Sequence, residues 1–327
     1  MFGRGDCHTS YDHSQALLRI LISSTDQTTI EGTAKPPLLL KLAFEVAVLG
    51  TSTMALFQRR ALSCMSLEDW QCLDRLHRRY YEGEQEVISF TSPLLQGHAA
   101  LFILLLRLVH VSRMQPSAMR EEHLSSIENQ LSTIEGEQKT TSPVCPNSHP
   151  TLHSWSTMWQ YVTIVLRIYL TSLQQPDLCS DSPQISTLAT TGLLKARMIW
   201  SLTDKGTFTW PSPFAASKTG ASRNIAGCTI AFILACAVND PQALGEIQVR
   251  LRHAEGCLSA SHFGNLARML EILLLRSQDG EDGQGRKGSC TADSVGSCRG
   301  RHDGLDLLRL PRGPFEILCL DSVVLGD

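Results

Sequence analysis

The chain has 327 residues, 43% of them hydrophobic, which is enough to bury a sizeable core in one large domain or two ordinary ones. Its 29 basic and 32 acidic side chains nearly cancel to a formal net charge of -3, which argues against direct binding to the phosphate backbone of nucleic acids. The eleven cysteines form no repeating framework, which favours free thiols in a reducing compartment.

Residues 1–36 are predicted to be a partly ordered leader. The first sixteen residues are polar, and Arg19 interrupts the short apolar patch that follows them. A signal peptide needs an uninterrupted apolar stretch, so we expect none here.

A helix is predicted over residues 66–81, where the Ser66 hydroxyl can cap the first turn in a Ser-x-x-Asp box. One face of it carries large side chains, namely Trp70, Leu73, His77 and Tyr80. Arginines add positive charge between residues 57 and 81, but acidic residues resume at Glu82. We interpret this charge as a solvated helix face and not as a nucleic-acid-binding stripe.

Two densely apolar stretches, 99–111 and 225–238, raise the question of a membrane span. Both are shorter than the roughly 18 to 20 apolar residues that a span needs, and Arg107 lies inside the first. They are therefore predicted to be buried core helices, and no membrane partner is expected.

A helix after Pro116 is indicated by Leu124, Ile127, Leu131 and Ile134, which repeat at intervals of three and four, and Gly136 is placed to end it. Residues 137–154 are rich in Ser, Thr and Pro and are predicted to form a disordered loop between two helical halves.

Further helices are predicted over residues 155–173, from Pro183 onward and after Asp240, which can cap a helix that has Pro241 at its first position. A last helix ends near Arg276. The positions assigned to core packing here are Leu244, Ile247, Leu251, Phe263, Leu266 and Leu270. With no alternating strand pattern, the expected fold class is all-α, an irregular array of roughly seven to nine helices. Residues 277–327 are predicted to be a disordered Gly/Arg-rich tail.

Several sequence motifs could in principle bind a nucleotide or a metal, but the sequence around them argues against it. Gly283, Gly285 and Gly288 satisfy Gly-x-Gly-x-x-Gly, but no strand precedes them and no helix follows. There is no Cys-x-x-Cys pair, and prolines break any helix that would align Cys145 with the histidines four and eight positions later. We expect no bound cofactor and no metal.

Nucleophilic catalysis has no local signature, because no Gly-x-Ser-x-Gly elbow occurs. His77, His98 and His110 are interpreted as side chains on helix surfaces or as satisfied core groups. No catalytic residue is therefore predicted.

Residues 37–276 carry a recognisable order of features. An apolar Tyr-containing helix is followed by a Trp-Pro pair, a Phe-Ile-Ala-Gly-Cys-x-Ala-like segment, and a Gly-Asn step into a final helix, and a Leu-Leu-Gly-like helix lies upstream. The residues concerned are Gly97, Trp210, Pro211, Phe232, Ala235, Cys236, Ala237, Gly264 and Asn265. In this order of features the chain resembles the helical regulatory domain of fungal-specific transcription factors.

The chain departs from that family in two ways. Residues 212–231 intervene between the Trp-Pro pair and the Phe-Ile-Ala-like segment, and one hypothesis is that they are a translated intron or a gene-model error. The binuclear zinc cluster, which needs six cysteines, is also missing, since only Cys7 lies in the first sixty residues. The family places DNA recognition in that module, so no sequence-specific DNA binding by this chain is expected.

The resemblance implies a non-catalytic regulatory module that acts in the nucleus at least part of the time. Its expected partners are a second copy of itself or other transcription regulators, with a small-molecule effector as a further ligand. The alternative is an all-helical enzyme or metabolite-binding protein with a pocket between the helical halves.

Overall fold

In the computed structural model the described residues are 7–27, 38–58, 62, 65–81, 95, 98–140, 150–204, 225–258, 267–268, 270–271 and 304–309. Within them every regular element is a helix, and the predicted all-α class is confirmed. The helices are α1 (Cys7–Gln27), α2 (Leu38–Ala55), α3 (Leu67–Tyr81), α5 (Ala99–Ser112), α6 (Ala118–Thr140), α7 (Pro150–Gln174), α8 (Pro183–Asp204), α9 (Ile225–Ala235), α10 (Pro241–Leu258) and α12 (Asp306–Arg309). All but the four-residue α12 have eleven residues or more.

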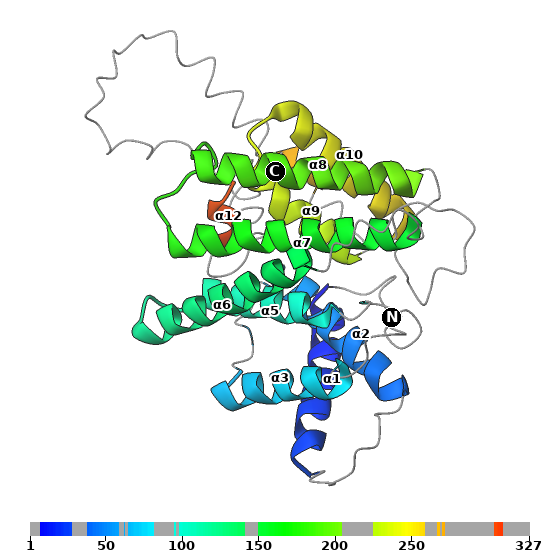
Figure 1. Cartoon of the computed structure of the whole chain (residues 1–327), viewed down its shortest axis with the longest axis vertical. Coiled ribbons are helices and arrows are strands. Elements are labelled where there is room, and N and C mark those ends of the chain that lie inside the picture. The colour runs from blue at the N-terminus through cyan, green and yellow to red at the C-terminus, as the bar shows by residue number, and fades with distance from the viewer. Residues whose placement is uncertain are drawn as a thin grey trace, which may run out of the picture.

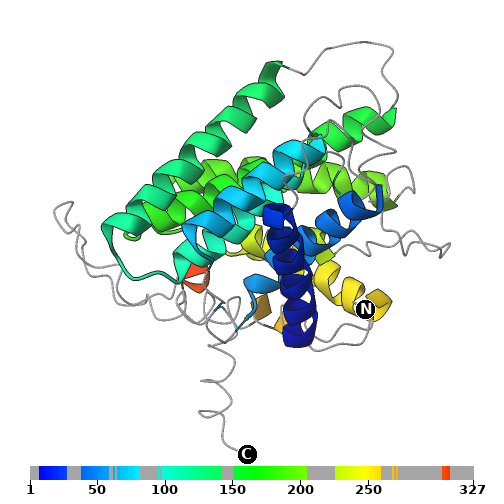
Figure 2. The ribbon, with the colours of Figure 1, turned by 90° about the horizontal axis from the view of Figure 1, so that it is seen from below.

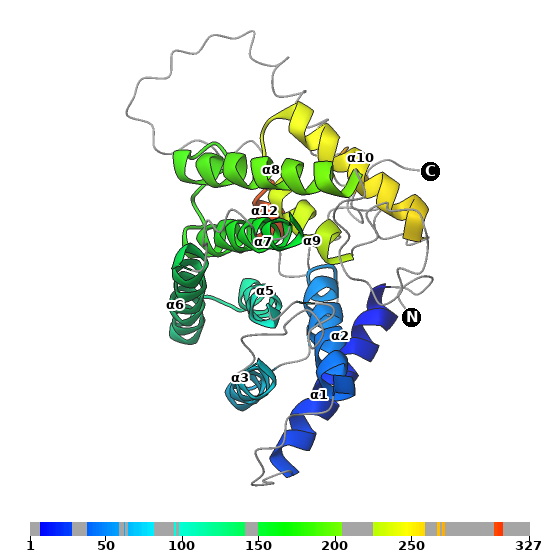
Figure 3. The same ribbon diagram turned by 45° about the vertical axis from the view of Figure 1, so that its right-hand side comes forward.

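The helices form an irregular array around α5 and α7 (Figure 1). Helices α7 and α8 run antiparallel along each other, and α5 and α6 pack against α7. Helix α3 lies beyond α5, and α3, α5 and α6 are seen almost end-on in Figure 3. Helices α1 and α2 pack together across this group, and Figure 2 shows α6 on the side away from α1. Helix α5 therefore lies between the α1–α2 pair and α6–α7.

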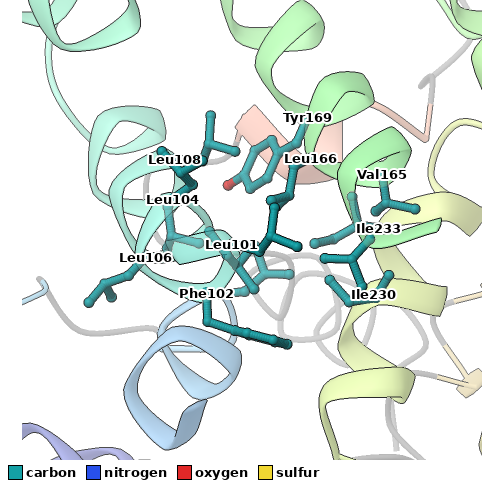
Figure 4. Close-up of a cluster of buried hydrophobic side chains, with 14 of the residues drawn as sticks. Leu101, Phe102, Leu104, Leu106, Leu108, Val165, Leu166, Tyr169, Ile230 and Ile233 are labelled. Atoms are coloured by element: carbon teal, nitrogen blue, oxygen red, sulfur yellow. The ribbon is translucent and has the colours of Figure 1, made fainter. Parts of the chain in front are cut away.

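The centre of the core lies between α5, α7 and α9 (Figure 4). Eleven of the fourteen residues of α5 are buried, so this helix is apolar around nearly its whole circumference. Its leucines meet Val165, Leu166 and Tyr169 of α7, and Ile230 and Ile233 of α9 complete the cluster. The described residues of the stretches 99–111 and 225–238 are therefore buried in the core, apart from the half-buried Ala100, His110 and Gly227.

Two of the predicted helix starts, at Ser66 and Asp240, are confirmed in atomic detail. At α3 the Asp69 N–H donates to the Ser66 hydroxyl over 3.1 Å, and the Ser66 N–H donates to the Asp69 carboxylate over 2.7 Å. These two bonds form a complete capping box. At α10 the Gln242 N–H donates to the Asp240 carboxylate over 3.0 Å, and Pro241 occupies the first helical position.

The predicted loop 137–154 is shorter than expected. Helix α6 passes through Gly136 and continues to Thr140, and α7 already begins at Pro150. Gly136 does not end the helix, and its continuation is held by Gln138, two residues before the helix end, which donates to the Thr163 hydroxyl of α7 over 3.0 Å. Pro150 starts α7 because a first helical position needs no N–H. Residues 141–149 lie outside the described residues.

The leader and the insert contribute regular structure. Residues 7–27 of the leader form the 21-residue α1, which buries Tyr11, Leu18, Leu21 and Ile22. Residues 225–231 of the insert belong to α9, whereas 212–224 lie outside the described residues.

Part of the predicted disordered tail is ordered. Gly304–Arg309 pack into the core, where Leu305, Leu307 and Leu308 are at most 3% exposed. These leucines supply the large apolar groups that the Gly-rich sequence before them lacks, so ordering them is favourable.

Helix α2 is the one described helix long and apolar enough to cross a membrane, with a hydropathy of 1.5 over 18 residues. Of this window, 61% is buried against the rest of the protein. Its Lys41 and Glu45 are buried too, and both contact Tyr81 of α3. These contacts are those of a core helix.

Candidate functional site: a buried polar seam along α3

The residues that carry the family resemblance are only partly described. Gly97, Trp210, Pro211, Gly264 and Asn265 lie outside the described residues. Phe232, Ala235, Cys236 and Ala237 are all at most 1% exposed at the end of α9.

Their surroundings are those of packing residues. The Phe232 ring meets Phe57 edge to face, with 5.7 Å between centroids. The small side chains at 235–237 let the backbone turn tightly, and the Ala237 N–H donates to the Leu234 carbonyl over 2.9 Å. Of the predicted core positions, Leu244, Ile247, Leu251 and Leu270 are buried, while Phe263 and Leu266 lie outside the described residues.

Buried and partly buried polar and aromatic side chains follow one face of α3. Trp70, Asp74, His77 and Tyr81 follow one another at intervals of four, three and four, which places them on a single helix stripe. We call this stripe, together with the groups around it on α2, α5, α6 and α7, the polar seam, and include in it His98 just before α5. It lies beside the apolar stripe of Leu73, Leu76 and Tyr80.

An ion pair in the polar seam joins the apolar helix α5 to α3. Arg107 donates to the Asp74 carboxylate over 2.7 Å and to the Gln130 amide oxygen of α6 over 3.1 Å. Its guanidinium lies over the Trp70 ring at 5.3 Å from the centroid. The Arg107 side chain is 9% exposed and the Asp74 side chain 29%, so the pair is partly shielded from solvent.

Tyr81 forms the next contact, with two residues of α2. Its hydroxyl donates to the Glu45 carboxylate over 2.7 Å, and the Lys41 ammonium lies over its ring at 4.5 Å. Glu45 also accepts from the Leu95 N–H over 3.3 Å, which satisfies its second oxygen. The contact ties α2, α3 and the chain before α5 together.

Three imidazoles of the seam are held neutral. Burial lowers the pKa of His77, His98 and His110 to about 4 in each case, because water cannot solvate the charged ring. His98 stacks on Trp159 of α7 at 4.4 Å, and His110 meets Trp70 edge to face at 5.3 Å.

The interpretation of these histidines as satisfied core groups is wrong for two of them. The Nε2 atoms of His77 and His110 are buried and have no hydrogen-bond partner, and the Nε atom of Arg107 has none either. Each ring packs against an aromatic neighbour: His77 lies 5.0 Å from the Tyr81 ring, and His110 lies against Trp70. An unpaired buried nitrogen costs roughly 1–3 kcal/mol.

The chemistry of the seam is limited by these environments. An imidazole with a pKa of about 4 is a weak base at neutral pH, and both carboxylates are engaged by hydrogen-bond donors. Among the described residues no group of three or more His, Cys, Asp or Glu side chains could hold a metal ion. Cys145, His149 and the Gly-x-Gly-x-x-Gly residues lie outside them.

Sequence reasoning missed the polar seam, although one signal was present. An arginine inside a thirteen-residue apolar stretch must find a partner if the helix is buried. Nothing local identifies Asp74 as that partner, because it lies 33 positions earlier in the chain.

Known proteins offer no further guidance to this arrangement. No family model, no curated protein and no solved structure matches the chain. The assignment of a function therefore depends on the resemblance in the sequence and on the geometry described above.

Proposed function

We propose that the chain is a non-catalytic, all-helical regulatory module of a fungal transcription regulator, which works in the nucleus through protein contacts. The resemblance of residues 37–276 to the regulatory domain of that family is the sequence argument. The structural argument is that partly buried arginines bind the carbonyl oxygens at helix ends.

The observation that carries the proposal is a set of arginines that hold helix ends. Arg113 donates to the carbonyl oxygens of Ala55 and Leu56 over 2.7 and 3.2 Å, at the C-terminus of α2. Arg120 donates to the Leu173 carbonyl at the end of α7 over 3.1 Å. Carbonyls at a helix C-terminus lack partners within the helix and carry the negative end of its dipole, so these contacts stabilise a scaffold.

The outward face of α8 is the surface we assign to protein contact. Thr187, Thr191, Leu194, Met198 and Ser201 are exposed and follow one another at intervals of four and three. Leu194 is 60% exposed and Met198 42%. The two threonine hydroxyls donate to carbonyls of α8 itself, over 2.7 and 2.8 Å, and this leaves their methyl groups available to a partner.

A second copy of this chain is the partner that suits this face. The exposed stripe is uncharged, and the nearby cations are engaged elsewhere, Lys195 with Gln160 and Arg197 with Glu246. Two such stripes can therefore meet without burying a charge, which would cost free energy. Spacings of four and three also match the seam along which paired helices pack.

The test combines a reporter assay with a measurement of mass in solution. The chain is fused to an unrelated DNA-binding domain, and the Leu194→Glu/Met198→Glu double variant is compared with Ser126→Glu/Asn129→Glu, which adds the same charge to exposed positions of α6. We expect the wild type and the control to change reporter output and to be dimeric by light scattering. The double variant should do neither.

A wild type that leaves the reporter unchanged would refute the regulatory role. If the wild type is monomeric but still changes the reporter output, the α8 stripe does not bind a second copy of the chain. Its partner is then another regulator.

The second candidate is a metabolite-binding protein, and the observation in its favour is the unpaired buried polar atoms. Besides the two imidazoles, the Tyr161 hydroxyl of α7 is buried without a partner, and burial raises its pKa well above the ordinary value. Native mass spectrometry of the purified protein would favour this candidate if a small molecule remains bound.

A further inference from the structure

The feature that the proposed function does not use is the isolated segment Gly304–Arg309. It lies far along the chain from the other described helices, yet it is deeply buried beside α7 (Figure 1). We call the surface it covers the α7–α9 groove, which is made by Tyr169 and Ser172 of α7, by Leu178 after α7 and by Cys236 at the end of α9.

Gly304 enters the groove at a point where no side chain fits. A Cβ atom added to it would lie 2.5 Å from the Cys236 carbonyl oxygen and 3.1 Å from two further Cys236 backbone atoms. Backbone atoms cannot move aside as a flexible side chain can, so this position requires glycine.

Hydrogen bonds then fix the depth and the direction of the segment. The Tyr169 hydroxyl donates to the Leu308 carbonyl over 3.3 Å. Arg309 donates through Nε to the Ser172 carbonyl over 3.0 Å and through Nη2 to the Leu178 carbonyl over 2.8 Å. Arg309 therefore joins Arg120 as a cation that binds the C-terminal end of α7.

The segment cannot hold this shape alone. Helix α12 has four residues, and isolated helices shorter than about 12 to 15 residues are marginal in water. Its helical turn forms because Leu305, Leu307 and Leu308 enter the groove and Arg309 finds its carbonyls. It thus folds when it docks, as short recognition peptides do.

We propose that the α7–α9 groove is a binding site for a short helical peptide, occupied in the intact chain by its own residues 304–309. The ligand it takes has a glycine at the entry, three leucines within the next four positions and an arginine at the end. Docking within one chain is favoured by the high effective concentration of a linked ligand. Separation from the chain removes that advantage, and the segment then becomes exchangeable.

The experiment uses the full chain. A recognition site for a specific protease, flanked by Gly-Ser spacers, is inserted after Gly288, and the purified protein is cleaved. A fluorescently labelled peptide of residues 300–313 is then added in excess, and its binding is followed by polarisation. Matched peptides carry Gly304→Ala, Arg309→Ala or a scrambled sequence.

We expect the C-terminal fragment to co-elute with the body after cleavage and to be replaced by the labelled peptide. The Gly304→Ala and Arg309→Ala peptides should each bind about tenfold more weakly or worse, a change that corresponds to about 1.4 kcal/mol. Uncleaved protein should bind the peptide far less, because its own segment competes.

Three outcomes would overturn the proposal. The fragment could separate at once from the folded body, the labelled peptide could fail to exchange, or the scrambled peptide could bind as well as the native one. All three leave the proposed regulatory role untouched, since that role depends on other surfaces. Circular dichroism of the cleaved body confirms that it stays folded during the assay.

Discussion

Single side chains of this protein serve as connections between distant helix ends. Arg113, Arg120 and Arg309 each donate to main-chain carbonyls more than 50 positions away. Burial lowers the pKa of Arg113, while nearby Tyr169 and Tyr11 act in the opposite direction. Charged donors make stronger hydrogen bonds than neutral ones, so a few arginines can fix the relative positions of several helices.

Two glycines differ sharply in what surrounds them. A Cβ added to Gly245 in α10 meets nothing within 4 Å, whereas one added to Gly304 meets the Cys236 backbone at 2.5 Å. We expect Gly245→Ala to raise the free energy of unfolding by roughly 0.5–1 kcal/mol, because glycine is a poor helix residue. Gly304→Ala should lower it by roughly 1–3 kcal/mol. Urea unfolding of both variants measures the difference, and equal effects would contradict the close approach at Gly304.

The buried imidazoles predict a loss of stability in acid. The pKa of His98 is lowered from 6.5 to about 4 in the folded protein. Between about pH 6.5 and pH 4 this side chain is therefore protonated in the unfolded chain but neutral in the folded one. Stability therefore falls as pH falls through this window. At pH 4.5 this histidine alone should account for about 2–3 kcal/mol.

The variant His98→Phe keeps a ring on Trp159 but cannot be protonated. Its urea midpoint should drop less than that of the wild type between pH 7 and pH 4.5. An identical drop in both proteins would show that this ring takes no part in the acid response.

At the scale of elements, pairs of helices are held in register by polar contacts at the edge of their apolar interface. Helices α6 and α7 are joined by Arg167, which bonds Glu128, Ser132 and Glu135 along one face of α6. These partners recur at intervals of four and three, so a shift of one turn would break several bonds together. The α3 seam acts in the same way on α5 through Asp74 and Arg107.

The Arg167 network should matter much more than an exposed ion pair. Arg167 is 17% exposed and donates over 3.0 Å to each oxygen of Glu135. We expect Arg167→Ala to cost about 1.5–3 kcal/mol of unfolding free energy, because hydrogen bonds to charged groups are lost. Arg252→Ala removes an exposed pair with Glu271 and should cost less than about 0.5 kcal/mol. Thermal unfolding of both variants is the measurement, and similar costs would contradict this ranking.

At the scale of the whole molecule, α5 joins the two sides of the array. It packs against α2 on one side and against α6 and α7 on the other, and its Leu104, Leu105 and Leu106 are at most 1% exposed. A destabilising substitution in this helix should therefore destabilise the whole core and not one side alone.

This arrangement predicts a single unfolding transition. Leu105→Ala should lower the free energy of unfolding by about 2–5 kcal/mol and shift the circular dichroism and tryptophan fluorescence transitions together. Met119→Ala, at an α6 position that is 62% exposed, is the control and should change stability by less than about 0.5 kcal/mol. Separate transitions for the two probes would show that the sides unfold independently.

The helical class, most helices and the starts at Ser66 and Asp240 follow from the sequence, because periodicity and capping act between residues within about four positions. The contacts that make up the polar seam, the continuation of α6 past Gly136 and the ordered turn at Gly304–Arg309 do not. Arg107 pairs with a residue 33 positions away, and Tyr169 donates to a carbonyl 139 positions away. Only the tertiary structure decides such pairings, because burial selects partners in space and local sequence carries no record of them.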